Sequence, residues 1–110
     1  FYHKKLNNKK LFFQSSNFTY SCALIYFQII FKETKLRDLI ANHLNKNKIG
    51  ISVHWDPILE KHDLFKSKKS CQNSYSLSKK ILSIPLYPSL KKRDQMKIIN
   101  LINHYLKFGQ

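Results

Sequence analysis

ISVHWDP, residues 51–57, and ILSIPLYPSL, residues 81–90, are the most informative stretches of this 110-residue chain. In the first stretch apolar and polar side chains alternate, which predicts a short strand with one buried face. Proline has no backbone N–H to donate, so Asp56-Pro57 is expected to end that strand. In the second stretch Pro85 and Pro88 allow only an edge strand or an extended connection.

Helical patterns flank both stretches. A helix is expected over residues 34–47, with Thr34 as its N-cap and Gly50 closing it. A second helix is expected over residues 72–82, and the clearest one over residues 91–106. The side chains expected to face a core are Leu36, Leu39, Ile40 and Leu44 in the first helix, Tyr75, Leu77, Ser78, Ile81 and Leu82 in the second, and Met96, Ile98, Ile99, Leu101, Ile102, Tyr105 and Leu106 in the third.

The rest of the chain supplies another strand and a loop. β-branched and aromatic residues predict a long, mostly buried strand over residues 20–31, central in the sheet, after a polar turn at residues 14–17. Residues 59–70 are expected to form a charged loop anchored by Leu59, Leu64 and Phe65. This order of elements predicts an α/β fold, a two-layer sandwich of a small sheet with helices on one face.

Residues 11–31 carry no charge and follow a lysine-rich segment, as in a signal anchor. Polar residues interrupt this stretch, and its continuous apolar runs are too short to span a bilayer. We therefore expect no membrane segment and no membrane partner. The alternative left open is a membrane-anchored, lysine-rich protein in which residues 11–31 form a helix.

The chain is strongly basic, with 20 Lys and Arg against 6 Asp and Glu and a formal net charge of +14. Its 43% apolar content excludes a disordered chain. The lysines are spread along the chain without a nucleic-acid-binding motif, so a solvated surface is expected and no nucleic acid partner. A small basic binding module for nucleic acid or another anionic surface stays open as an alternative.

Cysteine usage indicates the compartment. Cys22 and Cys71 lie far apart without zinc-binding spacing, so no metal site is expected. Both are expected to be buried or half-buried thiols, which favours a reducing cytoplasm.

The two quoted stretches resemble the C-terminal small domain of the DegT/DnrJ/StrS-type aminotransferases, which use pyridoxal phosphate to aminate nucleotide-linked keto sugars. The resemblance implies the C-terminal domain of a type I pyridoxal phosphate fold, in an enzyme of amino-sugar and cell-surface polysaccharide biosynthesis. It implies that residues 1–15 are the tail of a helix and connection from a missing large domain, and that residues 16–110 are the small domain. The complete enzyme is expected to be a cytoplasmic homodimer, and this chain, which begins at Phe1, a fragment.

The resemblance also assigns site residues. The family usually has His-Tyr where this chain has His54 and Trp55, at the edge of the substrate and cofactor site. In a regular strand His54 would face away from Val53 and Trp55, free for that role, although a surface or hydrogen-bonded strand histidine is the alternative. For Trp55 a core position is favoured over a ligand contact. His62 is a weaker candidate, and a solvated loop position is favoured for it.

The catalytic parts are expected to be missing. An aminotransferase needs an aldimine lysine, a carboxylate for the pyridinium nitrogen and donors for the cofactor phosphate. In the resembling family these come from the large domain, and no lysine here matches that motif, so no catalytic residue is assigned. The family's last helix also usually begins with Ser or Thr and acids, whereas this chain has Lys91, Lys92 and Arg93 there. That departure suggests relaxed constraint or an acidic partner surface.

Overall fold

A short antiparallel sheet and a pair of long helices organise the chain. The computed structural model describes residues 1–6, 8–13, 26–65 and 71–108. The helices are α1 (Tyr2–Lys5), α2 (Thr34–Lys46), α3 (Gln72–Ser78) and α4 (Lys92–Phe108), with a 3-10 turn at Leu59–Lys61, and the strands are β1 (Leu11–Phe13), β2 (Phe27–Phe31) and β3 (Ile81–Ile84).

The sheet has the order β1-β2-β3, and both pairings are antiparallel. Phe31 lies opposite Leu11 on one side, and Phe27 lies opposite Ile84 on the other. The prediction of a central strand ending at Phe31 is confirmed over β2, while the predicted residues 20–25 and the turn at residues 14–17 lie outside the described residues. β1 was not predicted, because the family resemblance implied a helix tail and connection over residues 1–15.

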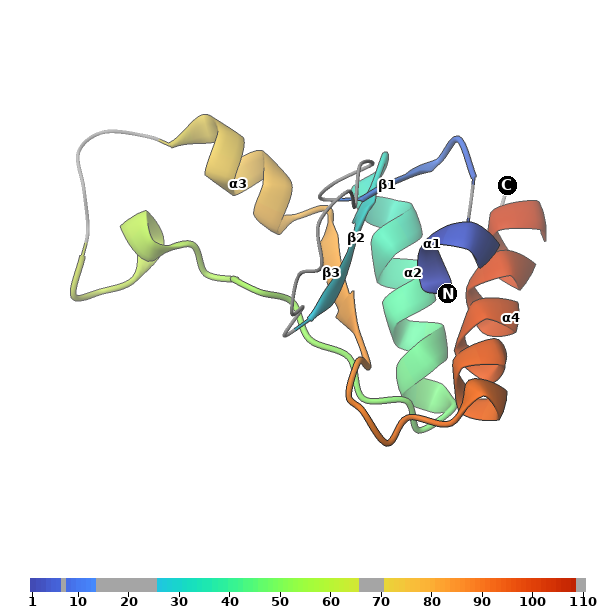
Figure 1. The fold of residues 1–110 in the computed structure, drawn as a ribbon. Coiled ribbons are helices and arrows are strands. Elements are labelled where there is room, and N and C mark those ends of the chain that lie inside the picture. The colour runs from blue at the N-terminus through green and yellow to red at the C-terminus, as the bar shows by residue number, and fades with distance from the viewer. Residues whose placement is uncertain (7, 14–25, 66–70, 109–110) are drawn as a thin grey trace.

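The elements form two layers. In Figure 1, α1, α2 and α4 cover one face of the sheet, while α3 and residues 55–65 extend from the opposite side; these two segments are called the arm. The predicted α/β architecture of a small sheet with helices packed on one face is therefore confirmed, with α3 as the exception. The core between the layers comprises Tyr2, Leu6, Leu11, Phe27, Ile29, Phe31, Leu36, Ile40, Leu44, Leu82, Ile84, Leu90, Ile98, Ile99, Ile102 and Leu106.

The boundaries of α2 differ in detail from the prediction. Thr34 is the first helical residue, and Glu33 occupies the N-cap without a side-chain hydrogen bond, so the predicted capping role of Thr34 is wrong. Lys48, with a positive φ of 59°, closes the helix, and the N–H of Ile49 donates to the carbonyl of Leu44 at 3.0 Å. This is a Schellman-type ending, and it comes before Gly50.

The apolar stripe of α2 is narrower than predicted. Leu36, Ile40 and Leu44 are buried, as expected, but Leu39 is half exposed. Arg37 takes a place on the buried side instead, where its Nη1 donates to the carbonyl of Ile81 at 3.4 Å. A buried guanidinium needs such partners because its desolvation is costly.

The region of residues 72–90 is divided differently from the prediction. α3 ends at Ser78, and Ile81–Ile84 is strand β3, so the predicted helix over residues 72–82 is too long. Tyr75 and Leu77 are exposed rather than inward, while Ser78 is buried. The segment between Pro85 and Pro88, expected as an edge strand or an extended connection, is a connection. The strand lies just before it, where Ile81–Ile84 pairs with β2.

α4 is the best-predicted element. Ile98, Ile99, Ile102 and Leu106 are buried, and Leu101 and Tyr105 are half buried. The first residues of the chain contact this helix, since Lys10 Nζ donates to the carbonyl of Leu106 at 3.4 Å. Tyr2 ties the same segment to the connection after β3, since its hydroxyl donates to the carbonyl of Pro85 at 3.1 Å.

The membrane-anchored alternative requires a helix over residues 11–31, and the described residues at both ends of that range are not helical. Leu11–Phe13 and Phe27–Phe31 are strands, and they pair with each other. Among the residues that the structure describes, no helix combines the length and the apolar character needed to cross a bilayer.

Candidate functional site

The segment that carries His54 is a turn rather than a strand. Ser52 makes a single antiparallel bridge with Ser83, with N–H to carbonyl distances of 3.1 and 2.8 Å. The backbone turns at His54 and Trp55, and the His54–Trp55 and Asp56–Pro57 peptide bonds are both cis. The predicted strand over residues 51–55, ended by Asp56-Pro57, is therefore wrong, because its pairing does not continue beyond one residue.

His54 lies against the sheet. Its Nδ1 is 3.0 Å from the hydroxyl of Ser83, and its ring centroid is 4.2 Å from that of Tyr26. Ser83 is buried within β3, so it offers a fixed partner for the imidazole. These two contacts orient a half-buried ring at the end of the sheet.

Trp55 has the opposite environment. Its side chain is 71% exposed, so the favoured core position is wrong. Because the chain turns here, the alternation of a strand no longer sends Trp55 to the buried side. Its ring centroid lies 4.8 Å from that of His54, so the indole lies beside the imidazole at the surface.

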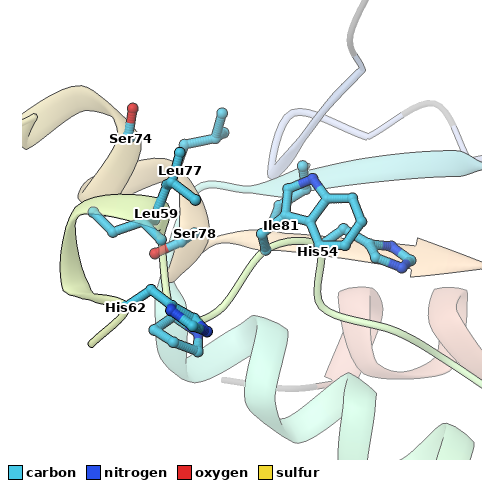
Figure 2. A pocket seen from close by; sticks show the side chains of 10 residues that line it. His54, Leu59, His62, Ser74, Leu77, Ser78 and Ile81 are labelled. Carbon is cyan, nitrogen blue, oxygen red and sulfur yellow. The ribbon is translucent and has the colours of Figure 1, made fainter. Parts of the chain in front are cut away.

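A cavity of about 560 Å³ opens beside these two residues. Figure 2 shows its walls, with His54 and Ile81 on one side and Leu59, His62 and the α3 residues Ser74, Leu77 and Ser78 on the other. The full lining is His54, Trp55, Pro57, Ile58, Leu59, His62, Ser74, Leu77, Ser78 and Ile81. The cavity therefore lies between the arm and the end of the sheet, with imidazole and hydroxyl groups among apolar side chains.

His62 is exposed, as its favoured loop position predicted, and it also lines the cavity. Its Nδ1 accepts a hydrogen bond from the N–H of Leu64 at 3.4 Å. Leu59, Leu64 and Phe65, the expected loop anchors, are 68%, 80% and 57% exposed, so that expectation is wrong. The structure brings all three candidates, His54, Trp55 and His62, around one cavity.

Other parts of the site were missed by sequence reasoning. Ser83 and Tyr26 hold the His54 ring, and Ser74 and Ser78 line the cavity. Ser83 did carry a signal, since it is a hydroxyl within the apolar run of residues 81–86. Tyr26 and the α3 residues carried none, because they meet His54 or the cavity only through contacts between residues far apart in the sequence.

The arm is held by polar contacts near the cavity. Lys79 Nζ lies 3.2 Å from the carboxylate of Asp56 and 5.6 Å from the centroid of the Tyr75 ring. The N–H of Cys71 donates to Glu60, and a side-chain hydrogen bond to Glu60 raises the pKa of the Cys71 thiol. Cys71 is exposed, contrary to the expectation of a buried or half-buried thiol, while Cys22 lies outside the described residues.

The sequence profile of the DegT/DnrJ/EryC1/StrS aminotransferase family matches residues 1–103. The chain belongs to this family. No curated protein has a sequence that matches this chain.

Solved aminotransferase structures have the same fold as this DegT/DnrJ/EryC1/StrS chain. A DegT DnrJ EryC1 StrS aminotransferase from Brucella abortus is 23% identical, with a TM-score of 0.80 over 94% of this chain and 28% of its own. The aminotransferase TlmJ from Streptoalloteichus hindustanus is 15% identical, with a TM-score of 0.86 over 99% of this chain and 30% of its own. DesV from S. venezuelae, solved in complex with a ketimine intermediate, is 15% identical, with a TM-score of 0.83 over 96% and 29%. This chain thus spans under a third of their length.

Pyridoxal phosphate is the cofactor implied by the family. It requires a lysine that forms an aldimine and a carboxylate that pairs with the pyridinium nitrogen. The lining residues include no lysine for an aldimine and no carboxylate for the pyridinium nitrogen. The nearby pair of Lys79 and Asp56 is engaged in its own ion pair. The lining of this cavity therefore does not fit the cofactor by itself. Nor do the described residues contain a group of three or more His, Cys, Asp or Glu side chains that could hold a metal ion.

Proposed function

We propose that this chain is the C-terminal small domain of a pyridoxal phosphate-dependent aminotransferase that acts on nucleotide-linked keto sugars. The observation that carries the proposal is the family match over residues 1–103 in a chain that covers under a third of the related enzymes. In this proposal residues 1–15 lead out of the large domain and residues 16–110 form the small domain. The product would serve amino-sugar and cell-surface polysaccharide biosynthesis.

The exposed apolar side chains of the arm support a missing partner. Trp55, Leu59, Leu64, Phe65, Tyr75 and Leu77 are each at least 42% exposed. Exposed apolar surface of this extent along one segment is typical of an interface. In the proposal the large domain of the same enzyme packs on the arm and closes the cavity. The complete enzyme forms a homodimer. The free thiol of Cys71 supports a reducing, cytoplasmic location.

The chemistry of this domain is binding and orientation. The cofactor, held by the large domain, would supply the electron sink for amino transfer. Since Ser83 engages Nδ1 of His54, Nε2 is the atom left to meet an oxygen of the substrate. Trp55 offers a flat ring and an indole N–H, but it lacks the hydroxyl of the tyrosine usual in the family. His62 would contact the same ligand from the opposite wall.

The test is a full-length enzyme in which this chain follows its own upstream large domain. The His54→Ala substitution should lower kcat/KM about 10- to 100-fold, the equivalent of one or two lost hydrogen bonds to the ligand. Asn45→Ala, an exposed polar change on α2, is the control and should leave kcat/KM unchanged. Circular dichroism of both variants separates loss of activity from loss of folding. Full activity in a folded His54→Ala enzyme would remove His54 from the site.

A further inference from the structure

Ser83 is the one polar residue of strand β3, which otherwise holds isoleucine and leucine. Its side chain is buried, with 3% of the residue exposed. An apolar, β-branched side chain would suit a buried strand position better, because a buried hydroxyl must find a hydrogen-bond partner. The partner of this hydroxyl therefore indicates what the serine does.

The side chain of Ser83 lies on the face of the sheet that is turned away from the helices. Leu82 and Ile84, its neighbours along β3, both belong to the core between the sheet and the helices. Successive side chains of a strand point to opposite faces, so Ser83 points to the other face. The arm extends from that same side of the sheet (Figure 1). The hydroxyl is therefore on the side where the candidate site lies.

Ser83 holds the segment of His54 through its backbone and through its side chain. The N–H of Ser52 donates to the carbonyl of Ser83 at 3.1 Å, and the N–H of Ser83 donates to the carbonyl of Ser52 at 2.8 Å. Two residues after Ser52, Nδ1 of His54 lies 3.0 Å from the hydroxyl oxygen of the same Ser83. The ring of Tyr26, with its centroid 4.2 Å from that of the imidazole, restricts rotation of the His54 ring.

The hydrogen bond between Ser83 and His54 can be formed in two ways. A hydroxyl has one proton to donate, and Nδ1 of a neutral imidazole either donates or accepts. Within the part of the chain that the structure describes, the imidazole is the only group that bonds to the Ser83 hydroxyl. If Nδ1 donated, the proton of the buried hydroxyl would have no acceptor. If the hydroxyl donates, both groups are satisfied, as buried polar groups in folded proteins generally are.

The direction of this hydrogen bond determines the tautomer of His54. A neutral imidazole carries its single ring proton on one of its two nitrogens. With Nδ1 as the acceptor, that proton is on Nε2. No group among the described residues bonds to Nε2, and the ring is half buried beside the cavity. The imidazole therefore offers an N–H donor to a ligand rather than a basic nitrogen.

We infer that Ser83 is a positioning residue that holds His54 as the Nε2–H tautomer, so that His54 meets its ligand as a hydrogen-bond donor. The identity of that ligand rests on the proposed function, in which it is a nucleotide-linked keto sugar. The ligand atom opposite Nε2 is then an acceptor, such as a carbonyl, ether or hydroxyl oxygen of the sugar. An ammonium group, which only donates, is rejected at this place.

Nuclear magnetic resonance of the 110-residue chain tests the tautomer directly. The histidines are labelled with ¹⁵N, and long-range ¹H–¹⁵N correlation spectra are recorded at alkaline pH, where the spectrum itself identifies neutral imidazoles. The signals that disappear in His54→Gln belong to His54. We expect Nε2 of His54 to have the chemical shift of a protonated nitrogen and Nδ1 that of an unprotonated, hydrogen-bonded one.

Substitutions of Ser83 separate its hydroxyl from its size. Ser83→Thr and Ser83→Val introduce β-branched side chains of similar shape, and only threonine has a hydroxyl. We expect Ser83→Thr to keep the Nε2–H tautomer and Ser83→Val to give averaged shifts from both tautomers. Ser83→Ala, which cannot overpack the site, should behave as Ser83→Val does. Ser52→Ala removes an exposed hydroxyl from the opposite residue of the bridge, and as the control it should leave the His54 signals unchanged.

A double-mutant cycle in the full-length enzyme tests whether Ser83 acts through His54. Ser83→Val should lower kcat/KM about tenfold, the effect of one weakened hydrogen bond to the ligand, and Ser83→Thr should lower it less than about threefold. In the His54→Ala background Ser83→Val should change kcat/KM less than about twofold, because the group that it positions is absent. Circular dichroism confirms that each variant is folded.

The spectra and the kinetics distinguish failure of this inference from failure of the proposed function. A protonated Nδ1 in the natural chain would overturn the inference, and so would a pure Nε2–H tautomer that persists in both Ser83→Val and Ser83→Ala. A tenfold loss from Ser83→Val in the His54→Ala background would overturn it too, because Ser83 would then act on another group. The expected spectra together with a fully active His54→Ala enzyme would support the tautomer and contradict the proposed function.

Discussion

The imidazole of His54 and the indole of Trp55 are adjacent in sequence, yet only the imidazole is held by the fold. His54 bonds to the buried hydroxyl of Ser83 and lies on Tyr26, whereas Trp55 is mostly exposed. The strand predicted from the sequence favoured the reverse, with Trp55 in the core and His54 on the free face. The difference has a direct consequence for stability.

We expect His54→Ala to lower the free energy of unfolding of this chain by about 1–2 kcal/mol, because it leaves the buried Ser83 hydroxyl without its partner. Trp55→Ala should lower it by less than about 0.5 kcal/mol, since most of the indole is already in water. Urea unfolding followed by circular dichroism measures both values. A larger loss for Trp55→Ala than for His54→Ala would contradict the environments described above.

Tyr2 gives a residue-scale prediction that depends on pH. Burial, followed by the neighbouring Tyr87, raises the pKa of Tyr2 from 10.0 to about 12. Between these values the folded state keeps a proton that the unfolded state has lost. The contribution of the Tyr2 phenol to the free energy of unfolding is therefore complete below pH 10 and is lost as the pH rises toward 12. The free energy of unfolding should therefore fall more steeply between pH 9.5 and pH 11 in the natural chain than in Tyr2→Phe.

Urea unfolding at several pH values in that range measures the difference. Every other ionisable group is present in both proteins, so the comparison with Tyr2→Phe isolates the contribution of the Tyr2 phenol. Tyr2→Phe should also lose about 1 kcal/mol at neutral pH, because the hydroxyl donates to the carbonyl of Pro85. Parallel pH curves for the two proteins would show that burial does not control this phenol.

At the scale of the element, α2 shows how one helical stripe is divided between core and solvent. Ile40 is 1% exposed and Leu39 is 50% exposed, although both belong to the predicted apolar face. The buried side of α2 also includes Arg37, which reaches the carbonyl of Ile81 on β3. The helix is therefore rotated so that Arg37, rather than Leu39, faces the sheet.

We expect Ile40→Ala to destabilise the chain by about 2–5 kcal/mol, because a fully buried side chain leaves a cavity. Leu39→Ala should cost less than about 1 kcal/mol, since alanine also favours the helix and half of the leucine is in water. The two substitutions remove aliphatic side chains of equal size from adjacent positions, and chemical unfolding compares them directly. Equal losses would mean that α2 packs with a different rotation.

At the scale of the whole molecule, the core buries its apolar side chains and the arm exposes them. The core is closed by α1, α2 and α4 on one face of the sheet, whereas the arm presents exposed apolar side chains (Figure 1). In the proposed function a large domain packs on the arm, a proposal supported by the family match and by the short span of this chain relative to the solved aminotransferases. The separate chain should fold around its core without forming a cofactor site.

We expect the isolated chain to form no stoichiometric Schiff base with pyridoxal phosphate, because the lining of the cavity includes no lysine. Absorbance spectra in the presence of the cofactor, followed by borohydride reduction and mass spectrometry, measure the outcome. Surface lysines should give only scattered, substoichiometric adducts. A single fully modified lysine would mean that this chain holds the cofactor itself.

Local patterns in the sequence determined the helices and strands in which buried residues recur at regular spacing along one face. The helices α2 and α4, the strand β2 at the centre of the sheet and the α/β arrangement follow from apolar spacing, and the residues 51–57 and 81–90 carried the family resemblance. These features are set by neighbours three, four or two residues apart, so they can be read without knowing the fold.

Only the tertiary structure decided the features that depend on contacts between distant residues. β1 forms because Leu11–Phe13 finds β2 beside it, and β3 replaces the end of the predicted helix because Ile81–Ile84 pairs with the other edge of β2. His54 is fixed by Ser83, 29 residues away, and the cavity exists because α3 returns beside the turn that carries His54. Pairing and cavity formation depend on long-range closure of the chain, which local periodicity does not encode.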